Sequence, residues 1–158
     1  FDKDLEKWKA VITDDNIIRF NAPFNVGSSE LPTNFSKKLA DFFPRYIKLL
    51  SNKKFKNEID EIRVEGHTSN GWGEEIDKQK IYLNNMNLSQ LRANNVLAYC
   101  YDLNNETIHK NLDWLQKNLR ANGMSFSKLL YKNNSKIEDK ARSRRVEFKV
   151  LIKEYQNK

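Results

Sequence analysis

The chain offers few side chains of the kind that perform covalent chemistry. His67 and His109 lie far apart in the sequence, and neither has another histidine or a cysteine at metal-ligand spacing. Cys100 is the only cysteine and falls on an apolar helical stripe, which favours a buried structural thiol over a nucleophile. The sequence contains no Gly-rich phosphate loop and suggests no nucleophile–base–acid set. We therefore expect a protein that is not an enzyme and that has no cofactor or metal ion.

The informative residues form three blocks that suit non-covalent binding. They are Val64–Ser69 (VEGHTS), Asn85–Ala93 (NMNLSQLRA) and Arg144–Glu147 (RRVE). The second block contains Arg92, whose planar guanidinium can pair with a carboxylate through two parallel hydrogen bonds. The alternative is that Arg92 is an ordinary surface arginine in an i,i+4 pair. Each block alone is a weak signal, and the ordered set is the specific one.

Together the blocks resemble the OmpA-like peptidoglycan-binding domain family, from Ile17 to Ile152. In that family a strand ends in Gly-His-Thr-Asp, a helix opens with Asn-x-x-Leu-Ser-x-x-Arg-Ala, and the last strand carries Asn-Arg-Arg-Val-Glu. The resemblance implies an α/β sandwich with a βαβαβ core, in which helices back a mixed sheet. It also implies non-covalent binding of the peptidoglycan stem peptide at its diaminopimelate end. That end is a zwitterion, so its pocket needs a cation for the carboxylate and acceptors for the ammonium group.

The resemblance places Arg92 at the carboxylate-binding position, and Thr68 and Asn85 at positions that line the pocket. Asn85 could instead brace a turn, as Asn often does. We expect Arg92 early in its helix, where the free N–H groups of the first turn would favour a carboxylate. The loop Asn21–Gly27 is expected to form the opposite wall of the pocket, with Asn25 as the residue chosen within it.

The last block adds a second arginine to the expected site. Arg144 matches its first arginine and is expected to reach the ligand, whereas Arg145 is expected to support the strand or pair with an acid. The family has Asn before these two arginines and this chain has Ser143, so the turn is expected to differ. Trp72 lies between two glycines and could either stack on a sugar or fold back as a hydrophobic anchor.

The chain departs from the family where an Asp would hold the ammonium group. It has Ser69 there, followed by Asn70, and both are predicted ligand-binding residues. Hydrogen bonds to charged groups contribute about 1.5–3 kcal/mol, against about 1 kcal/mol for neutral pairs, so the substitution should weaken binding. One hypothesis is that Glu74, Glu75 or Asp77 replaces the missing carboxylate. The alternative is that all three are solvated loop charges.

Hydrophobic periodicity predicts the elements that must position these residues. Strands are expected near residues 17–20, 59–65, 126–131 and 146–152, and helices near 5–12, 31–50, 87–101 and 108–119. Pro44 should kink the second helix or end its first half. Asn87 is the expected N-cap of the third helix, and Gly123 the expected stop after the fourth. Glu65 is expected to point outward from its strand, as are Glu61 and Arg63.

This order of elements implies crossover connections and a mixed sheet with helices packed on one face. The segment Gly66–Asn84 reads as a long polar loop, and loops of that length are usually functional or mobile. We expect an N-terminal linker helix at residues 1–15, followed by one OmpA-like domain at residues 16–158.

The composition fits a globular domain that meets an anionic polymer. The chain has 158 residues, of which 39% are apolar, and its net charge is +7. Such a charge suits an acidic wall polymer, and it could equally be a Lys- and Asn-rich bias of a solvated surface. A nucleic-acid partner is not expected, because the basic residues form no stripe with interleaved aromatics. No apolar run approaches the ~18 residues that a membrane span needs, and no signal peptide is present, so any anchor is expected upstream.

In organisation the chain resembles the wall-binding domain of stator-type membrane proteins, such as the B subunits of the flagellar motor and of the Zorya defence system. This resemblance implies a periplasmic domain that an upstream transmembrane helix ties to the inner membrane. It also implies a membrane motor partner and a homodimer. The main alternative is an OmpA-like scaffold that has lost ligand binding and serves as a dimerisation or protein-interaction module, which Ser69 favours.

Overall fold

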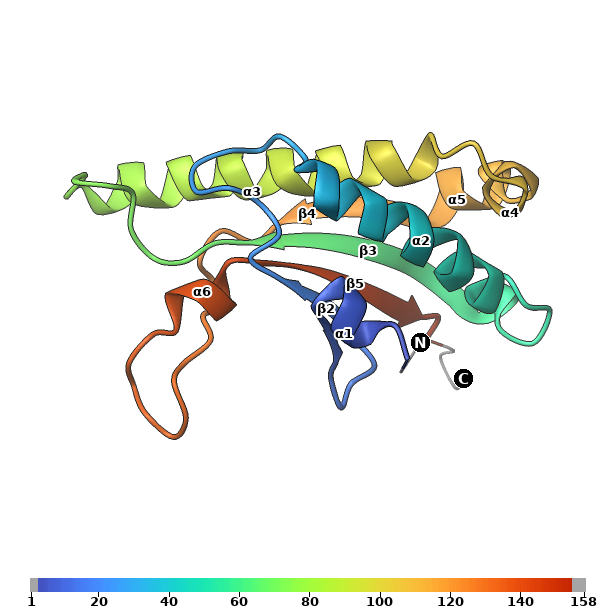
Figure 1. The fold of residues 1–158 in the computed structure, drawn as a ribbon, viewed down its shortest axis with the longest axis horizontal. Coiled ribbons are helices and arrows are strands. Elements are labelled where there is room, and N and C mark those ends of the chain that lie inside the picture. Colours follow the sequence, from blue (N-terminus) through green and yellow to red (C-terminus); the bar gives the residue numbers. More distant parts are fainter. Residues whose placement is uncertain (1–2, 155–158) are drawn as a thin grey trace.

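The computed structural model describes residues 3–154 and builds them around one five-stranded sheet (Figure 1). The strands are β1 (Ala10–Ile12), β2 (Ile18–Asn21), β3 (Ile59–His67), β4 (Leu119–Gly123) and β5 (Arg145–Ile152). They lie in the order β1-β2-β5-β3-β4, in which β3 and β4 run parallel and the other neighbours antiparallel. The predicted mixed sheet is confirmed.

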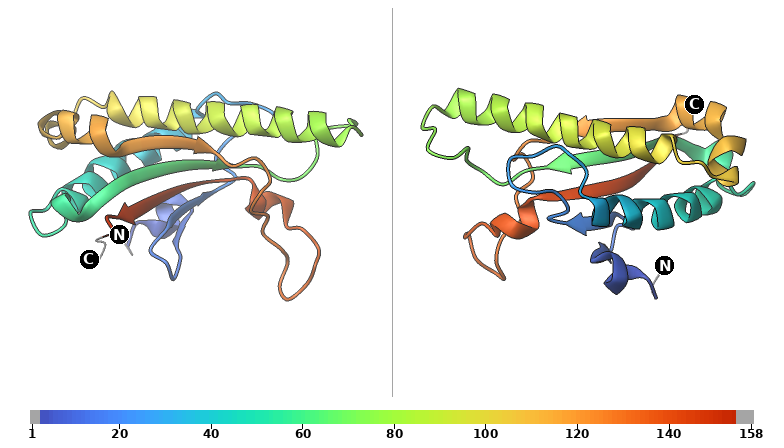
Figure 2. Two further views of the ribbon diagram at one scale, coloured as in Figure 1. Left: turned by 180° about the vertical axis from the view of Figure 1, so that it is seen from behind. Right: turned by 45° about the horizontal axis from the view of Figure 1, so that its top comes forward.

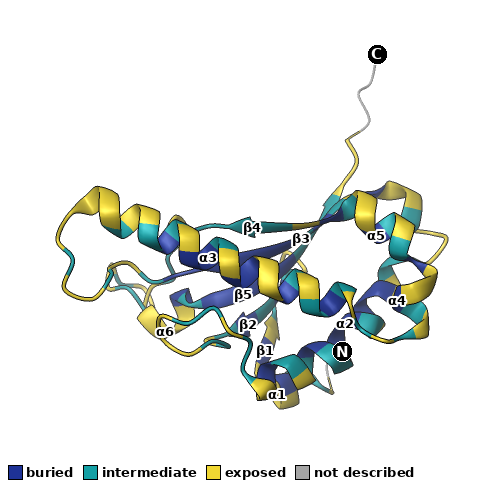
Figure 3. Ribbon diagram, turned by 90° about the horizontal axis from the view of Figure 1, so that it is seen from above, coloured by how far each residue is buried: buried dark blue, intermediate teal, exposed yellow. Residues whose placement is uncertain are grey.

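Two long helices, α2 (Thr33–Leu50) and α3 (Lys78–Tyr101), lie over one face of this sheet (Figures 1 and 2). The shorter elements are α1 (Leu5–Trp8), η1 (Lys56–Glu58), α4 (Glu106–Lys110), α5 (Leu112–Asn118) and α6 (Lys140–Ser143). The buried sides of α2 and α3 face the strands, as Figure 3 shows in dark blue. The predicted sheet backed by helices is therefore confirmed as well.

An aromatic cluster joins α2 to the sheet. Phe148 of β5 lies with its ring centroid 5.1 Å from that of Phe42 and 6.0 Å from that of Phe20, both in edge-to-face geometry. Rings in such geometry contribute beyond the area they bury. The predicted apolar stripe of α2 supplies this contact, and it continues through Pro44 to Leu50 without a break. The expectation that Pro44 could end the helix is wrong, because residues on both sides of it pack into the same core.

Helix α3 begins at Lys78, nine residues before the predicted cap Asn87. The side chain of Asp77 caps it by accepting hydrogen bonds from the backbone N–H groups of Gln79 (2.9 Å) and Lys80 (3.4 Å). The early turns extend past the sheet (Figure 1), so Leu83 on them remains 62% exposed. A helix segment that extends past the sheet shows no apolar stripe, and periodicity therefore placed the start of α3 too late.

Two short edge strands differ from the predicted elements. The expected helix over residues 5–12 ends at Trp8, where Lys9 adopts a left-handed conformation (φ 52°), and Ala10–Ile12 pairs with β2 as β1. The expected helix through Leu119 ends before that residue, and Leu119–Gly123 forms β4 beside β3. Residues 126–131 hold turns and one isolated bridge in place of the predicted strand.

Candidate functional site

The register of the two central strands brings Thr68 and Arg144 to the same end of the sheet. His67, the last residue of β3, is paired with Arg145, the first residue of β5. Thr68 and Arg144 are the next residues outward on each strand, and a cavity of about 380 Å³ lies beside them. Its lining comes from the loops around residues 26 and 70, from α3 and from the end of α6. The lining residues are Val26, Gly27, Thr68, Ser69, Asn70, Gly71, Trp72, Gly73, Asn85, Leu88, Arg92, Lys140 and Arg144.

The cavity gathers nearly all of the residues predicted from the sequence. Those in its lining are Thr68, Ser69, Asn70, Asn85, Arg92 and Arg144. Asn25 is not among them, since it is exposed and contributes its backbone carbonyl to Arg92. The expected wall from its loop is present, and Val26 and Gly27 form it. The structure thus brings the predicted residues together, and their role in ligand binding stays a prediction.

Arg92 lies in the middle of α3 and is 5% exposed. Its Nε donates to the carbonyl of Ser28 (2.8 Å) and its Nη2 to that of Asn25 (3.0 Å), while Phe24 lies under the guanidinium at 5.0 Å. Burial, with the charge of Arg144 as a second cause, lowers the pKa of Arg92 to about 10, so it stays cationic at neutral pH. The expectation that a helix start assists Arg92 is wrong, because the helix begins more than three turns earlier.

Two further cations line the cavity beside Arg92. Arg144 is partly exposed, and among the described residues nothing forms an ion pair with its side chain. Lys140 lies in the first turn of α6, four residues before Arg144, and sequence reasoning missed it. The signal available in the sequence was Asp139, which caps α6. This short helix places both Lys140 and Arg144 in the lining of the cavity.

Thr68 and Asn85 supply neutral polar groups. Thr68 is 3% exposed, and its hydroxyl has no hydrogen-bond partner among the residues described. The amide nitrogen of Asn85 donates to the carbonyls of Gly71 (2.9 Å) and Ile81 (3.0 Å). Asn85 therefore braces the loop at Gly71 and also lines the cavity, so both of its predicted roles have a structural basis. Trp72 is partly buried and contributes to the lining.

The loop acids do not take the place of the missing carboxylate. Asp77 is occupied by the N-terminus of α3, and Glu75 accepts from the backbone N–H of Asp77 (3.1 Å). Neither they nor Glu74 line the cavity, whose described lining contains no acidic residue. The hypothesis that one of these three acids reaches the ligand site is wrong for this conformation of the loop.

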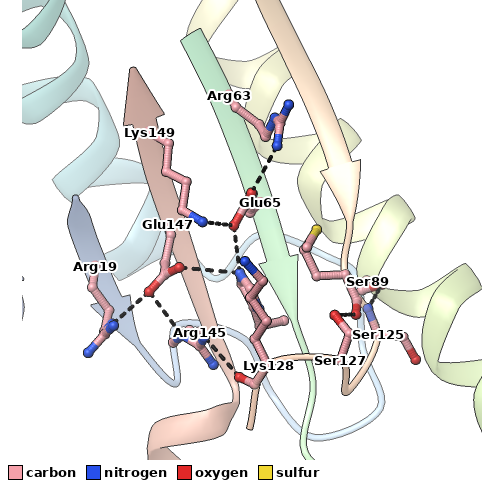
Figure 4. A network of polar contacts seen from close by, with 12 residues as sticks. Arg19, Arg63, Glu65, Ser89, Ser125, Ser127, Lys128, Arg145, Glu147 and Lys149 are labelled. Carbon is pink, nitrogen blue, oxygen red and sulfur yellow. Dashed lines mark hydrogen bonds and ion pairs between the residues drawn. The ribbon is translucent and has the colours of Figure 1, made fainter. Parts of the chain in front are cut away.

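An ionic network lies on the sheet face opposite the long helices (Figure 4). Glu147 accepts hydrogen bonds from Arg19 (2.7 Å) and Arg145 (3.0 Å), and Glu65 forms an ion pair with Lys149 (3.0 Å). Glu65 lies on this outward face of its strand, as expected, but it is fully buried among the charged side chains there. Arg145 pairs with an acid as predicted, and it also donates to the carbonyl of Ser143 (3.0 Å), which fixes the backbone next to Arg144.

The pKa values of the two acids follow from this network. Burial alone would raise the pKa of Glu65, but hydrogen bonds from His67 and Lys149 outweigh it and hold the pKa at about 2. Burial opposes ionisation of Glu147 too, yet His67, Arg145 and Arg19 keep the pKa of Glu147 well below its usual range. Both acids are therefore ionised at neutral pH.

Glu65, His67 and Glu147 also form a group that could offer ligand atoms to a metal ion, since these atoms lie within 4.8 Å of one another. The Nε2 of His67 is 2.9 Å from Glu65 and 3.3 Å from Glu147. Cationic side chains already neutralise both carboxylates, and a bound cation would have to displace them. The arrangement is that of a structural ion network.

A sequence profile described as the OmpA family matches residues 23–144. The Zorya protein ZorB of Escherichia coli is 42% identical over 155 residues, which cover 96% of this chain and 64% of ZorB. The chain thus spans less than two thirds of that relative's length.

Solved structures with the same fold include several envelope proteins. The cell wall anchor of the type VI secretion system of Pseudomonas aeruginosa has a TM-score of 0.58 at 20% identity, covering 96% of this chain and 94% of that one. A MotB-like protein of Desulfovibrio vulgaris has a TM-score of 0.56 at 24% identity, with coverages of 94% and 81%. The periplasmic domain of Helicobacter pylori MotB has a TM-score of 0.54 at 17% identity, with coverages of 90% and 80%. At these identities the likeness shows the fold.

Proposed function

Because the chain belongs to the OmpA family, we propose that it holds peptidoglycan non-covalently at the cavity around Arg92. The ligand portion is the diaminopimelate end of the stem peptide, and the binding anchors a membrane protein to the cell wall. The observation that carries this proposal is the state of Arg92. It is buried and held in place by two backbone carbonyls, yet it lines an open cavity with a second arginine beside it.

The chemistry of the cavity suits a carboxylate. No described residue accepts a hydrogen bond from Nη1 of Arg92, so this edge of the fork is free for a ligand. A preorganised guanidinium gives up little side-chain entropy when it binds, because the protein has already fixed it. Arg144 can approach the same carboxylate, and Thr68 lies in the lining beside it. The volume of about 380 Å³ lies in the range of small-ligand sites.

The similarity to ZorB supports the larger role. ZorB is 42% identical to this chain, and in this proposal a membrane helix precedes the wall-binding domain and joins a motor partner. In this proposal the domain lies in the periplasm and is tied to the inner membrane. Among the described residues, no helix has both the length and the apolar character that crossing a membrane requires.

The proposal is tested with purified cell walls of two chemistries. The chain should sediment with peptidoglycan whose stem peptides contain diaminopimelate. It should remain in the supernatant with walls that contain lysine at that position, because lysine lacks the second carboxylate that Arg92 would bind. If neither wall sediments the chain, the proposal is wrong, and the alternative of a scaffold without ligand binding is favoured.

A further inference from the structure

All charged residues in the described lining of the cavity are positive. Arg92, Lys140 and Arg144 contribute positive charge, and Ser69 stands where the family has its acid. A ligand that carries an ammonium group next to its carboxylate would meet repulsion there unless an anion lay nearby. Such a ligand therefore requires an acidic residue close to the cavity.

Glu138 does not line the cavity itself, but it is hydrogen-bonded to a residue that does, Asn70. Its Oε1 accepts a hydrogen bond from the backbone N–H of Asn70 at 2.9 Å. That N–H belongs to the residue that follows Ser69, so the carboxylate of Glu138 lies close to the backbone at position 69. No described residue donates a hydrogen bond to the second oxygen, Oε2, and the side chain is partly exposed. One oxygen is thus fixed by the protein while the other is available.

The backbone around Glu138 is anchored on both sides. Glu138 forms an isolated β-bridge with Tyr131. Two backbone hydrogen bonds flank this bridge, from the N–H of Lys132 to the carbonyl of Ile137 (2.9 Å) and from the N–H of Asp139 to the carbonyl of Leu130 (2.8 Å). The side chain of Asp139 then caps α6, the helical turn that carries Lys140 and ends at Arg144. One short segment therefore sets the position of an anion and of two of the cations.

We propose that Glu138 is the specificity-determining residue for the ammonium group of the ligand, in place of the acid that Ser69 replaces. This inference rests on the proposed function, since it assigns a second half to the same binding site. The carboxylate of the ligand lies at Arg92 and Arg144, and its ammonium group lies between Glu138 and the hydroxyl of Ser69. The pairing restores charge balance without an acid inside the cavity.

The test compares two ligands that differ only in the ammonium groups. These are meso-diaminopimelate and pimelate, which is the same seven-carbon dicarboxylate with a hydrogen in place of each ammonium group. Each ligand is titrated into the protein, and NMR chemical shifts of the protein report binding. Glu138→Gln keeps an oxygen that can accept from Asn70 and removes the charge. It should weaken binding of diaminopimelate about tenfold and change that of pimelate less than about twofold, because the ammonium group loses its ion pair and keeps only a hydrogen bond to a neutral amide. Glu74→Gln, which removes an exposed loop charge outside the cavity, should change neither.

A second variant separates charge from loop bracing. Ser69→Asp placed in the Glu138→Gln background should restore the preference for diaminopimelate, because it returns a carboxylate to the same side of the site. Equal weakening of both ligands by Glu138→Gln, or no weakening, would overturn the role of Glu138 and leave the proposed function standing. Failure of the unchanged chain to bind either compound would overturn the proposed function and this inference with it.

Discussion

Gly66 of β3 is paired with Gly123 of β4, and the backbone of α3 passes directly over both. A Cβ at Gly66 would collide with the backbone carbonyl of Ser89, and one at Gly123 would lie 2.6 Å from the backbone nitrogen of Gln90. The two glycines let α3 approach the sheet closely enough for Gln90 to accept from the N–H of Gly123 at 2.7 Å. This approach fixes where Arg92, two residues further along α3, enters the cavity.

Gly66→Ala should therefore destabilise the fold. Backbone cannot move aside as the end of a flexible side chain can, so we expect a loss of about 1–3 kcal/mol or more in the free energy of unfolding. Chemical denaturation monitored by circular dichroism measures it. Lys117→Ala, an exposed substitution in α5, serves as the control and should stay within about 0.5 kcal/mol. Equal stability of Gly66→Ala and the unchanged chain would show that α3 does not lie this close to β3.

The start of α3 gives a second prediction. Asp77→Ala removes the N-cap and should cost about 1 kcal/mol, with faster amide hydrogen exchange in residues 79–83. Asn87→Ala lies at an exposed position in the middle of the helix and should be neutral or slightly stabilising, because Ala has the higher helix propensity. The opposite ranking of the two variants would mean that the helix starts near Asn87.

The buried network predicts a pH dependence of stability. The pKa of Glu65 in the folded protein is about 2, below its ordinary value of 4.5, so ionised Glu65 stabilises the fold at pH values above about 4.5. That stabilisation is lost as the pH falls toward 2. Glu65→Gln should cost about 3 kcal/mol at pH 7, and the difference should shrink steadily below pH 4.5.

Denaturation curves of both proteins between pH 2 and 7 measure this difference. Glu30→Gln, at an exposed loop position, removes the same charge and should show no such trend. A difference that stays constant over this range would contradict the proposed role of Glu65 ionisation.

Strongly periodic elements could be predicted from the sequence. The stripe of α2 and the alternation in β5 are both long, and burial on one face leaves a readable pattern in each. Leu119–Gly123 could not be recognised as a strand, because five residues directly after a helix carry too little alternation. Its identity as β4 depends on parallel pairing with β3, which is a tertiary contact.

The site shows the same division. Arg92 and Thr68 lie in sequence blocks of a known family, so they could be named in advance. Glu138 could not, because its position depends on how the segment after residue 130 folds back against the loop at Asn70, and for Lys140 the only signal was the Asp139 cap. The burial of Glu65 was missed for a related reason, since strand alternation gives the face of a side chain and not whether other charged residues cover that face.

Arg92 is the residue proposed to bind the ligand carboxylate, and wall binding should depend on it more than on any other side chain of the cavity. The decisive measurement is the dissociation constant of a diaminopimelate-containing stem peptide for the unchanged chain and for Arg92→Lys, by calorimetry. Lysine keeps the charge and loses the planar fork, so affinity should fall at least about tenfold. Lys48→Ala, an exposed change on α2, should bind as the unchanged chain does. Unaltered affinity of a folded Arg92→Lys protein would contradict the account.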